Sequence, residues 1–159
     1  MNRQPEVLQI TAAIGALCIG VLVYVLDRHT EFVYFLSGWP SFNSVPVGFF
    51  GNIGDYLPTF VHVYAFILLT VVVAVPAISK LVPVCLAWFA IDSLFELAQL
   101  NPIAQWIGSH TPMGFSGIPF LDNTADYFLS GTFDMLDLLS IATGALAAYL
   151  TIVIITRRA

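Results

Sequence analysis

Charged residues are scarce in this chain of 159 residues, since only 9% are Asp, Glu, Lys or Arg. A soluble domain has about a quarter. Five residues are basic and ten are acidic, so the formal net charge is −5. So few basic residues cannot form the positive stripe with which proteins hold nucleic-acid phosphates. The scarcity of charge therefore excludes an ordinary soluble enzyme, a nucleic-acid-binding protein and a disordered tail.

Cysteines and established catalytic motifs are also scarce. Cys18 and Cys85 fall in two different apolar runs, and their spacing fits neither a metal site nor a disulfide. We expect both to be buried free thiols that pack as small apolar groups. The chain contains no H-E-x-x-H motif, no nucleophile elbow and no phosphate-binding loop.

Hydrophobic residues are abundant, at 58% of the chain with a mean hydropathy of +0.88. A run of about 20 apolar residues is long enough to cross a bilayer as a helix. The runs are continuous rather than alternating, which argues against a membrane β-barrel. We therefore predict an all-α membrane protein with four transmembrane helices in a single polytopic domain, 1–159. The predicted spans are 7–26, an uncleaved anchor, then 57–79 and 81–100, which form a tight hairpin, and 132–155.

The basic residues predict an orientation. Arg3, Lys80, Arg157 and Arg158 flank one end of the predicted spans, and only Arg28 flanks the other. Cytoplasmic segments carry the excess of Lys and Arg. We therefore expect both termini in the cytoplasm of a bacterium, with the plasma membrane as the location and the long connections 27–56 and 101–131 outside.

The two outer connections are rich in aromatic residues, which favour the headgroup layer of a membrane. The apolar residues of 119–130 fall roughly on one helical side, so we expect a short helix that lies in the outer interface or dips into it. The aromatic residues are Phe32, Tyr34, Phe35, Trp39, Phe42, Phe49 and Phe50 in the first connection, and Trp106, Phe115, Phe120, Tyr127 and Phe128 in the second.

The few polar residues of the predicted spans recur at helical spacing. Residues three, four and seven positions apart share one face of a helix. The predicted orientation places nearly all of these polar groups in the outer half of the membrane, with Asp92 deeper. They are Asp55, Thr59 and His62 in the second span, Asp92, Glu96 and Gln99 in the third, and Asp134 and Asp137 in the fourth.

A carboxylate at the centre of a spanning helix costs roughly 2.5–3.5 kcal/mol on the insertion scale, so such residues usually face a bundle interior or a wet cavity. Structural roles are open for each group. Asp55 and Asp134 suit helix N-termini, His62 suits a packed hydrogen-bonded histidine, and Asp92 and Glu96 suit polar contacts between helices. Asp137 lies too far into its predicted span for capping. The small residues Ala12, Ala16, Gly20, Gly144 and Ala148 indicate close helix packing.

The run His62-x-Tyr64, then Glu96-x-x-Gln99, then Asp134-x-x-Asp137 ahead of Gly144 resembles the VanZ-like bacterial membrane proteins. This resemblance covers about 55–149 and indicates a divergent member. The family usually has an arginine where Ser130 and Gly131 stand, and an asparagine where Ile141 stands. The resemblance implies a role in the cell envelope and an association with resistance to the lipidated glycopeptide teicoplanin.

Three functions are compatible with this pattern. The favoured one is an outward-opening polar pocket that binds an amphiphilic envelope ligand, such as a lipid headgroup or a lipoglycopeptide. The second is an intramembrane enzyme acting on a lipid-linked envelope precursor, which uses His62 as a base or holds a divalent metal ion. The third is a proton-coupled carrier that works as a homodimer. The expected ligand-binding residues are His62, Asp92, Glu96, Gln99, Asp134 and Asp137, the catalytic candidates are His62, Glu96 and Asp137, and the metal candidates are His62, Glu96, Asp134 and Asp137.

Overall fold

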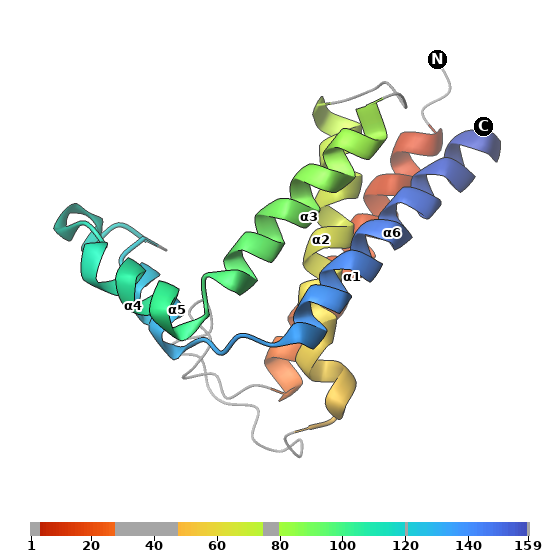
Figure 1. Cartoon of the computed structure of the whole chain (residues 1–159). Helices are drawn as coiled ribbons and strands as arrows, with labels where there is room; N and C mark the ends of the chain where they lie inside the picture. Colours follow the sequence, from red (N-terminus) through yellow and green to blue (C-terminus); the bar gives the residue numbers. More distant parts are fainter. Residues whose placement is uncertain (1–3, 28–47, 75–79, 120, 159) are drawn as a thin grey trace.

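The computed structural model describes residues 4–27, 48–74, 80–119 and 121–158, and its regular elements there are all helices (Figure 1). Three helices are long and the other four are shorter. The long helices are α1 (Gln4–Asp27), α2 (Asn52–Ala74) and α6 (Met135–Arg158); the shorter ones are α3 (Leu81–Leu97), α4 (Asn101–His110), the 3-10 turn η4 (Met113–Phe115) and α5 (Thr124–Ser130).

Helices α1, α2 and α6 are each long and apolar enough to cross a membrane. Helices α3 and α4 pass the same test only as a pair, and the chain bends by 89° between them. The all-α class is therefore confirmed, with three helices that could span a membrane, or four candidate spans if the bent pair is one span. The direction in which these helices cross a membrane stays a prediction.

Several helix boundaries differ from the predicted spans, and the end of α3 has a local cause. Helix α2 begins at Asn52, ahead of the predicted start, and carries Pro58 inside it. Helix α3 ends at Leu97 because Leu100 is extended, with ψ of 128°, and Pro102 in the first turn of α4 has no N–H to donate back along α3. Helix α6 begins at Met135 rather than at residue 132.

The connection between α3 and α6 is more helical than the sequence predicted. The helix expected over 119–130 is present only as the seven residues of α5, and α4 was not predicted. Helices α4 and α5 lie beside one another, away from α1, α2 and α6 (Figure 1). Gly108 of α4 faces Leu129 at a distance that leaves no room for a Cβ atom. The Phe128 ring of α5 stacks on Phe95 of α3, with centroids 5.9 Å apart.

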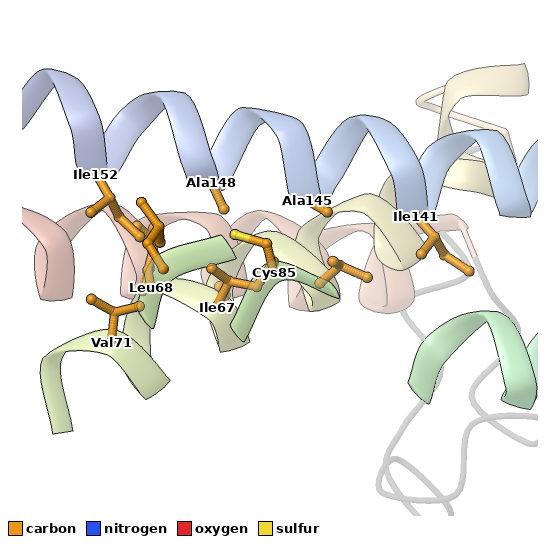
Figure 2. Close-up of a cluster of buried hydrophobic side chains, with 12 residues drawn as sticks. Ile67, Leu68, Val71, Cys85, Ile141, Ala145, Ala148 and Ile152 are labelled. Carbon is orange, nitrogen blue, oxygen red and sulfur yellow. The ribbon is translucent and has the colours of Figure 1, made fainter. Parts of the chain in front are cut away.

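The apolar core is formed where α2 packs against α1, α6 and α3 (Figure 2). A Cβ atom on Gly144 would lie 2.7 Å from the Phe60 carbonyl oxygen, so α6 approaches the backbone of α2 closely. A Cβ atom on Gly20 would lie 3.2 Å from a side-chain methyl of Val61, which is a looser contact with a side chain, so both glycines lie at helix contacts as predicted. The core residues are Ala13, Val63, Ala65, Ile67, Leu68, Val71, Leu81, Cys85, Ile141, Ala145, Ala148 and Ile152.

Both cysteines are free, as predicted, but only Cys85 is buried. Cys18 is exposed on α1, so the prediction of two buried thiols was wrong for this residue. Apolar residues surround Cys18 in the sequence, but the sequence does not show which side of α1 packs against a neighbouring helix.

The helices place the polar residues at one end of the bundle. The beginnings of α1 and α3 and the end of α6 lie at one end, and the beginnings of α2 and α6 lie at the other (Figure 1). Residues 75–79, which lead into the predicted hairpin turn at Lys80, lie outside the described residues, as do six of the predicted aromatic loop residues: Phe32, Tyr34, Phe35, Trp39, Phe42 and Phe120.

Candidate functional site

A cavity of about 780 Å³ lies between α1, α2, α3, α5 and the beginning of α6. This volume is in the range of sites that bind small molecules. Asp55, His62, Asp92, Glu96, Gln99 and Asp137, all singled out from the sequence, line it. The other lining residues are Leu17, Gly20, Val21, Tyr24, Pro58, Thr59, Val61, Trp88, Ile91, Phe95, Tyr127, Ser130, Gly131 and Ile141.

A polar contact between α2 and α3 in this cavity joins His62 to Asp92. Nδ1 of His62 lies 3.0 Å from Oδ2 of Asp92. The Asp92 side chain is 10% exposed, whereas the His62 side chain is 49% exposed. The His62 ring also makes edge-to-face contacts with Phe66 and Trp88, at centroid distances of 4.3 and 6.3 Å. One side of the imidazole is thus fixed by a carboxylate and two rings, while the side chain remains half open.

Glu96 joins the end of α3 to the beginning of α6. It is buried, and its Oε1 accepts a hydrogen bond of 2.7 Å from the backbone N–H of Asp134. Its Oε2 accepts a weaker one of 3.3 Å from Gln99 Nε2. Gln99 lies beyond the last residue of α3, so the predicted continuous polar stripe exists only as far as Glu96. Gly131 faces the Gln99 side chain so closely that a Cβ atom there would overlap it.

Asp134 caps α6, because its Oδ1 accepts the N–H of Leu136 at 2.8 Å. This contact confirms the cap role that its sequence position suggested. Oδ2 of Asp134 accepts a second hydrogen bond, 3.1 Å long, from the Tyr56 hydroxyl on α2. Asp134 does not line the cavity, but it connects Glu96 and Tyr56 around the edge of it.

Asp137 lies in the first turn of α6 and is not its cap, but it is nearer the start of the helix than the predicted span 132–155 placed it. This difference follows from the later start of the helix. The N-terminus of α6 favours a negative charge at this position. Asp137 Oδ1 also accepts a 2.7 Å hydrogen bond from the Thr59 hydroxyl. Asp55 lies in the first turn of α2, where the same preference applies.

Tyr56, Trp88 and Tyr127 take part in the site without having been assigned roles from the sequence. Trp88 Nε1 donates to Thr70 Oγ1 at 2.9 Å and so fixes the indole beneath His62. Tyr127 on α5 lines the cavity. Partial burial, and after it the neighbouring Tyr24 and Glu96, raise the pKa of the Tyr127 phenol above its ordinary value. Tyr127 is therefore a neutral hydroxyl at the cavity wall.

The cavity is rich in hydrogen-bond acceptors. Asp55, Asp92, Glu96 and Asp137 line it, and the described basic side chains, Lys80 and Arg157, do not. No three His, Cys, Asp or Glu side chains within the described ranges are grouped so that they could hold a metal ion. The residues predicted to bind a metal ion take part in separate contacts. His62 pairs with Asp92, whereas Glu96 contacts the backbone of Asp134.

The walls of the cavity are apolar where they meet the outside of the bundle. Val21, Ile91 and Phe95 line the cavity and are 49%, 42% and 51% exposed. The site therefore combines acidic acceptors with an imidazole on one side and aliphatic and aromatic surface on the other. This pairing suits a molecule with a polar head and an apolar tail.

Comparison of the chain with models of protein families, with curated proteins and with solved structures finds no significant match.

Proposed function

We propose that this protein binds an amphiphile whose polar head enters the cavity beside His62, Asp92 and Glu96. The observation that carries the proposal is that acidic residues of three helices meet an apolar wall in one cavity. Buried acids are costly in a membrane unless they have partners or face a wet cavity. Here each of Asp92 and Glu96 has a partner, and both face a space large enough for a ligand.

The chemistry of the lining residues favours a head that donates hydrogen bonds. Ionised carboxylates only accept hydrogen bonds. A primary ammonium or a hydroxyl-rich head supplies donors, and an ammonium also offsets the negative charge of Asp55, Asp92, Glu96 and Asp137. A carboxylate or phosphate head meets like charge in the same space, which disfavours binding. The preferred ligand therefore has a cationic head.

The proposed location is the plasma membrane of a bacterium, with both termini in the cytoplasm and the cavity open to the outside. Support for this orientation comes from Lys80 and Arg157, which lie at the end of the bundle opposite the cavity, because cytoplasmic segments carry an excess of basic residues. The VanZ-like resemblance adds a role in the cell envelope; it rests on His62, Tyr64, Glu96, Gln99, Asp134, Asp137 and Gly144. Labelling of a cysteine placed at residue 159 of a Cys18→Ser, Cys85→Ala chain in intact cells tests the orientation. Reaction of this cysteine with a membrane-impermeant thiol reagent would place the C-terminus outside the cell and so reverse the proposed orientation.

The binding test uses three alkyl compounds with the same chain and different heads: hexadecylamine, hexadecanol and palmitate. The purified protein in nanodiscs is titrated with each, and binding is measured by competition with a fluorescent long-chain amine. We expect saturable binding of the amine, weaker binding of the alcohol and none of the acid. Equal binding of the amine and the acid would contradict the proposal.

A second candidate function is catalysis, which the His62–Asp92 pair favours. A carboxylate at 3.0 Å from Nδ1 orients an imidazole so that its other nitrogen can take a proton from water or a hydroxyl group. The substrate would be a lipid-linked envelope precursor bound by its head. Incubation with radiolabelled membrane lipids, comparing the parent protein with His62→Gln, tests it. Product formed equally by both proteins, or by neither, would eliminate this candidate.

A further inference from the structure

We infer that the cavity opens sideways between α1 and α3, so that a membrane lipid places its head inside while its acyl chain stays in the bilayer. This inference rests on the proposed function. The relative positions of the helices provide the first argument. Helix α1 packs mainly on α2, and α3 packs on α6 and α2. The face of α2 that carries Pro58 and His62 lines the cavity between them.

The exposure of the lining residues provides the second argument. His62 pairs with Asp92 on one side, yet its side chain remains 49% exposed. It lies about 15 Å along α2 from Asn52, given the rise of an α-helix. A polar ring this far along a spanning helix needs water or a polar ligand beside it. A headgroup that enters from the side supplies that contact.

The edges of the opening provide the third argument. Val21 and Leu22 on α1 and Ile91 on α3 are large apolar side chains that are 49%, 49% and 42% exposed. Val21 and Ile91 line the cavity as well, so the apolar outer surface is continuous with the polar interior. A cavity of this size holds a headgroup and the beginning of a chain. The remainder of a long acyl chain then lies against α1 and α3, in the membrane.

The test uses a long-chain primary amine with a photoreactive diazirine at the middle of its chain, added to the protein in phosphatidylcholine nanodiscs. We expect hexadecylamine, but not palmitate, to compete with the label, and the labelled peptides to come from α1 and α3. Ile91→Trp fills one edge of the opening and should lower labelling at least fivefold. Leu94→Trp is the matched control, because Leu94 lies on the same helix and is 65% exposed but does not line the cavity.

The outcomes separate the two proposals. If hexadecylamine does not bind saturably to the parent protein, the proposed function fails. If it binds but the label lies on α4 and α5, or Ile91→Trp labels as well as Leu94→Trp does, the sideways opening is wrong and the proposed function stands. Val21→Trp narrows the opening from the opposite edge and should give the same loss, which keeps the test decisive if Ile91→Trp does not fold.

Discussion

His62 and Asp92 face each other across the interface between α2 and α3, with Nδ1 and Oδ2 3.0 Å apart. The pair joins a half-exposed ring to a buried carboxylate, so Asp92 both fixes the ring and supplies charge to the cavity. Few other polar contacts connect these two helices in the described residues, apart from Trp88 to Thr70. The position of the imidazole therefore depends on Asp92.

Asp92→Asn should weaken the binding of hexadecylamine about tenfold or more. A charge-assisted hydrogen bond contributes about 1.5–3 kcal/mol, and 1.4 kcal/mol corresponds to a factor of ten. Titration in nanodiscs measures the change. Glu6→Gln removes one negative charge near the opposite end of α1 and should leave affinity within twofold. An equal loss in both variants would show that net charge, rather than the cavity, controls binding.

Glu96→Ala should abolish amine binding and also lower the thermal stability, while the protein still inserts into the membrane. The substitution removes the acceptor of the part-buried Asp134 N–H, and an unpaired buried donor costs about 1–3 kcal/mol, which is the upper bound here. Glu96→Gln retains a carbonyl oxygen for this N–H and removes only the charge. We therefore expect Glu96→Gln to lose binding but to unfold near the parent temperature, as followed by intrinsic fluorescence in detergent. Full binding by Glu96→Ala would show that the site is misplaced.

The hydrogen bond from Tyr56 to Asp134 predicts energetic coupling between α2 and the cap of α6. Asp134→Ala should cost about 0.5–2 kcal/mol through the lost cap. Tyr56→Phe should cost less when Asp134 is already alanine than when it is present. A double-mutant cycle based on denaturation in mixed micelles measures the difference. Strictly additive effects would mean that the two side chains do not interact.

The sequence predicted the helical class and the cluster of acids because both depend on patterns that hydrophobicity and spacing reveal. It placed Asp137 too deep because the start of α6 is set by the cap at Asp134 rather than by the apolar run. It missed the bend after Leu97, since the apolar run continues to Leu100 and only Pro102 indicates a break. The pairing of His62 with Asp92, rather than with Glu96, depends on how the helices are rotated, which spacing within each helix does not determine.

Because the pKa of Tyr127 is raised, its phenol should ionise at a higher pH than an ordinary tyrosine does. Burial disfavours the phenolate, so the neutral form persists as the pH rises past 10. The absorbance of phenolate near 295 nm is followed as the pH rises, in the parent protein and in Tyr127→Phe. The parent protein should show an ionisation step above pH 10 that Tyr127→Phe lacks. A difference step at or below pH 10 would show that the cavity wall does not disfavour the phenolate of Tyr127.

Gly144 and Gly15 form a matched pair for testing the contact between α2 and α6. A Cβ atom on Gly144 would lie 2.7 Å from the Phe60 carbonyl oxygen, whereas one on Gly15 would meet nothing within 4 Å. Gly144→Ala should therefore destabilise the protein by about 1–3 kcal/mol through overpacking. Gly15→Ala should be neutral, or stabilising by up to about 1 kcal/mol, because alanine has a higher helix propensity than glycine. Both substitutions add one methyl group to a helix, so propensity alone predicts the same sign for both. Opposite signs in thermal unfolding would therefore isolate the close approach of the two helices, and a stabilised Gly144→Ala would show that α6 does not approach α2 at this point.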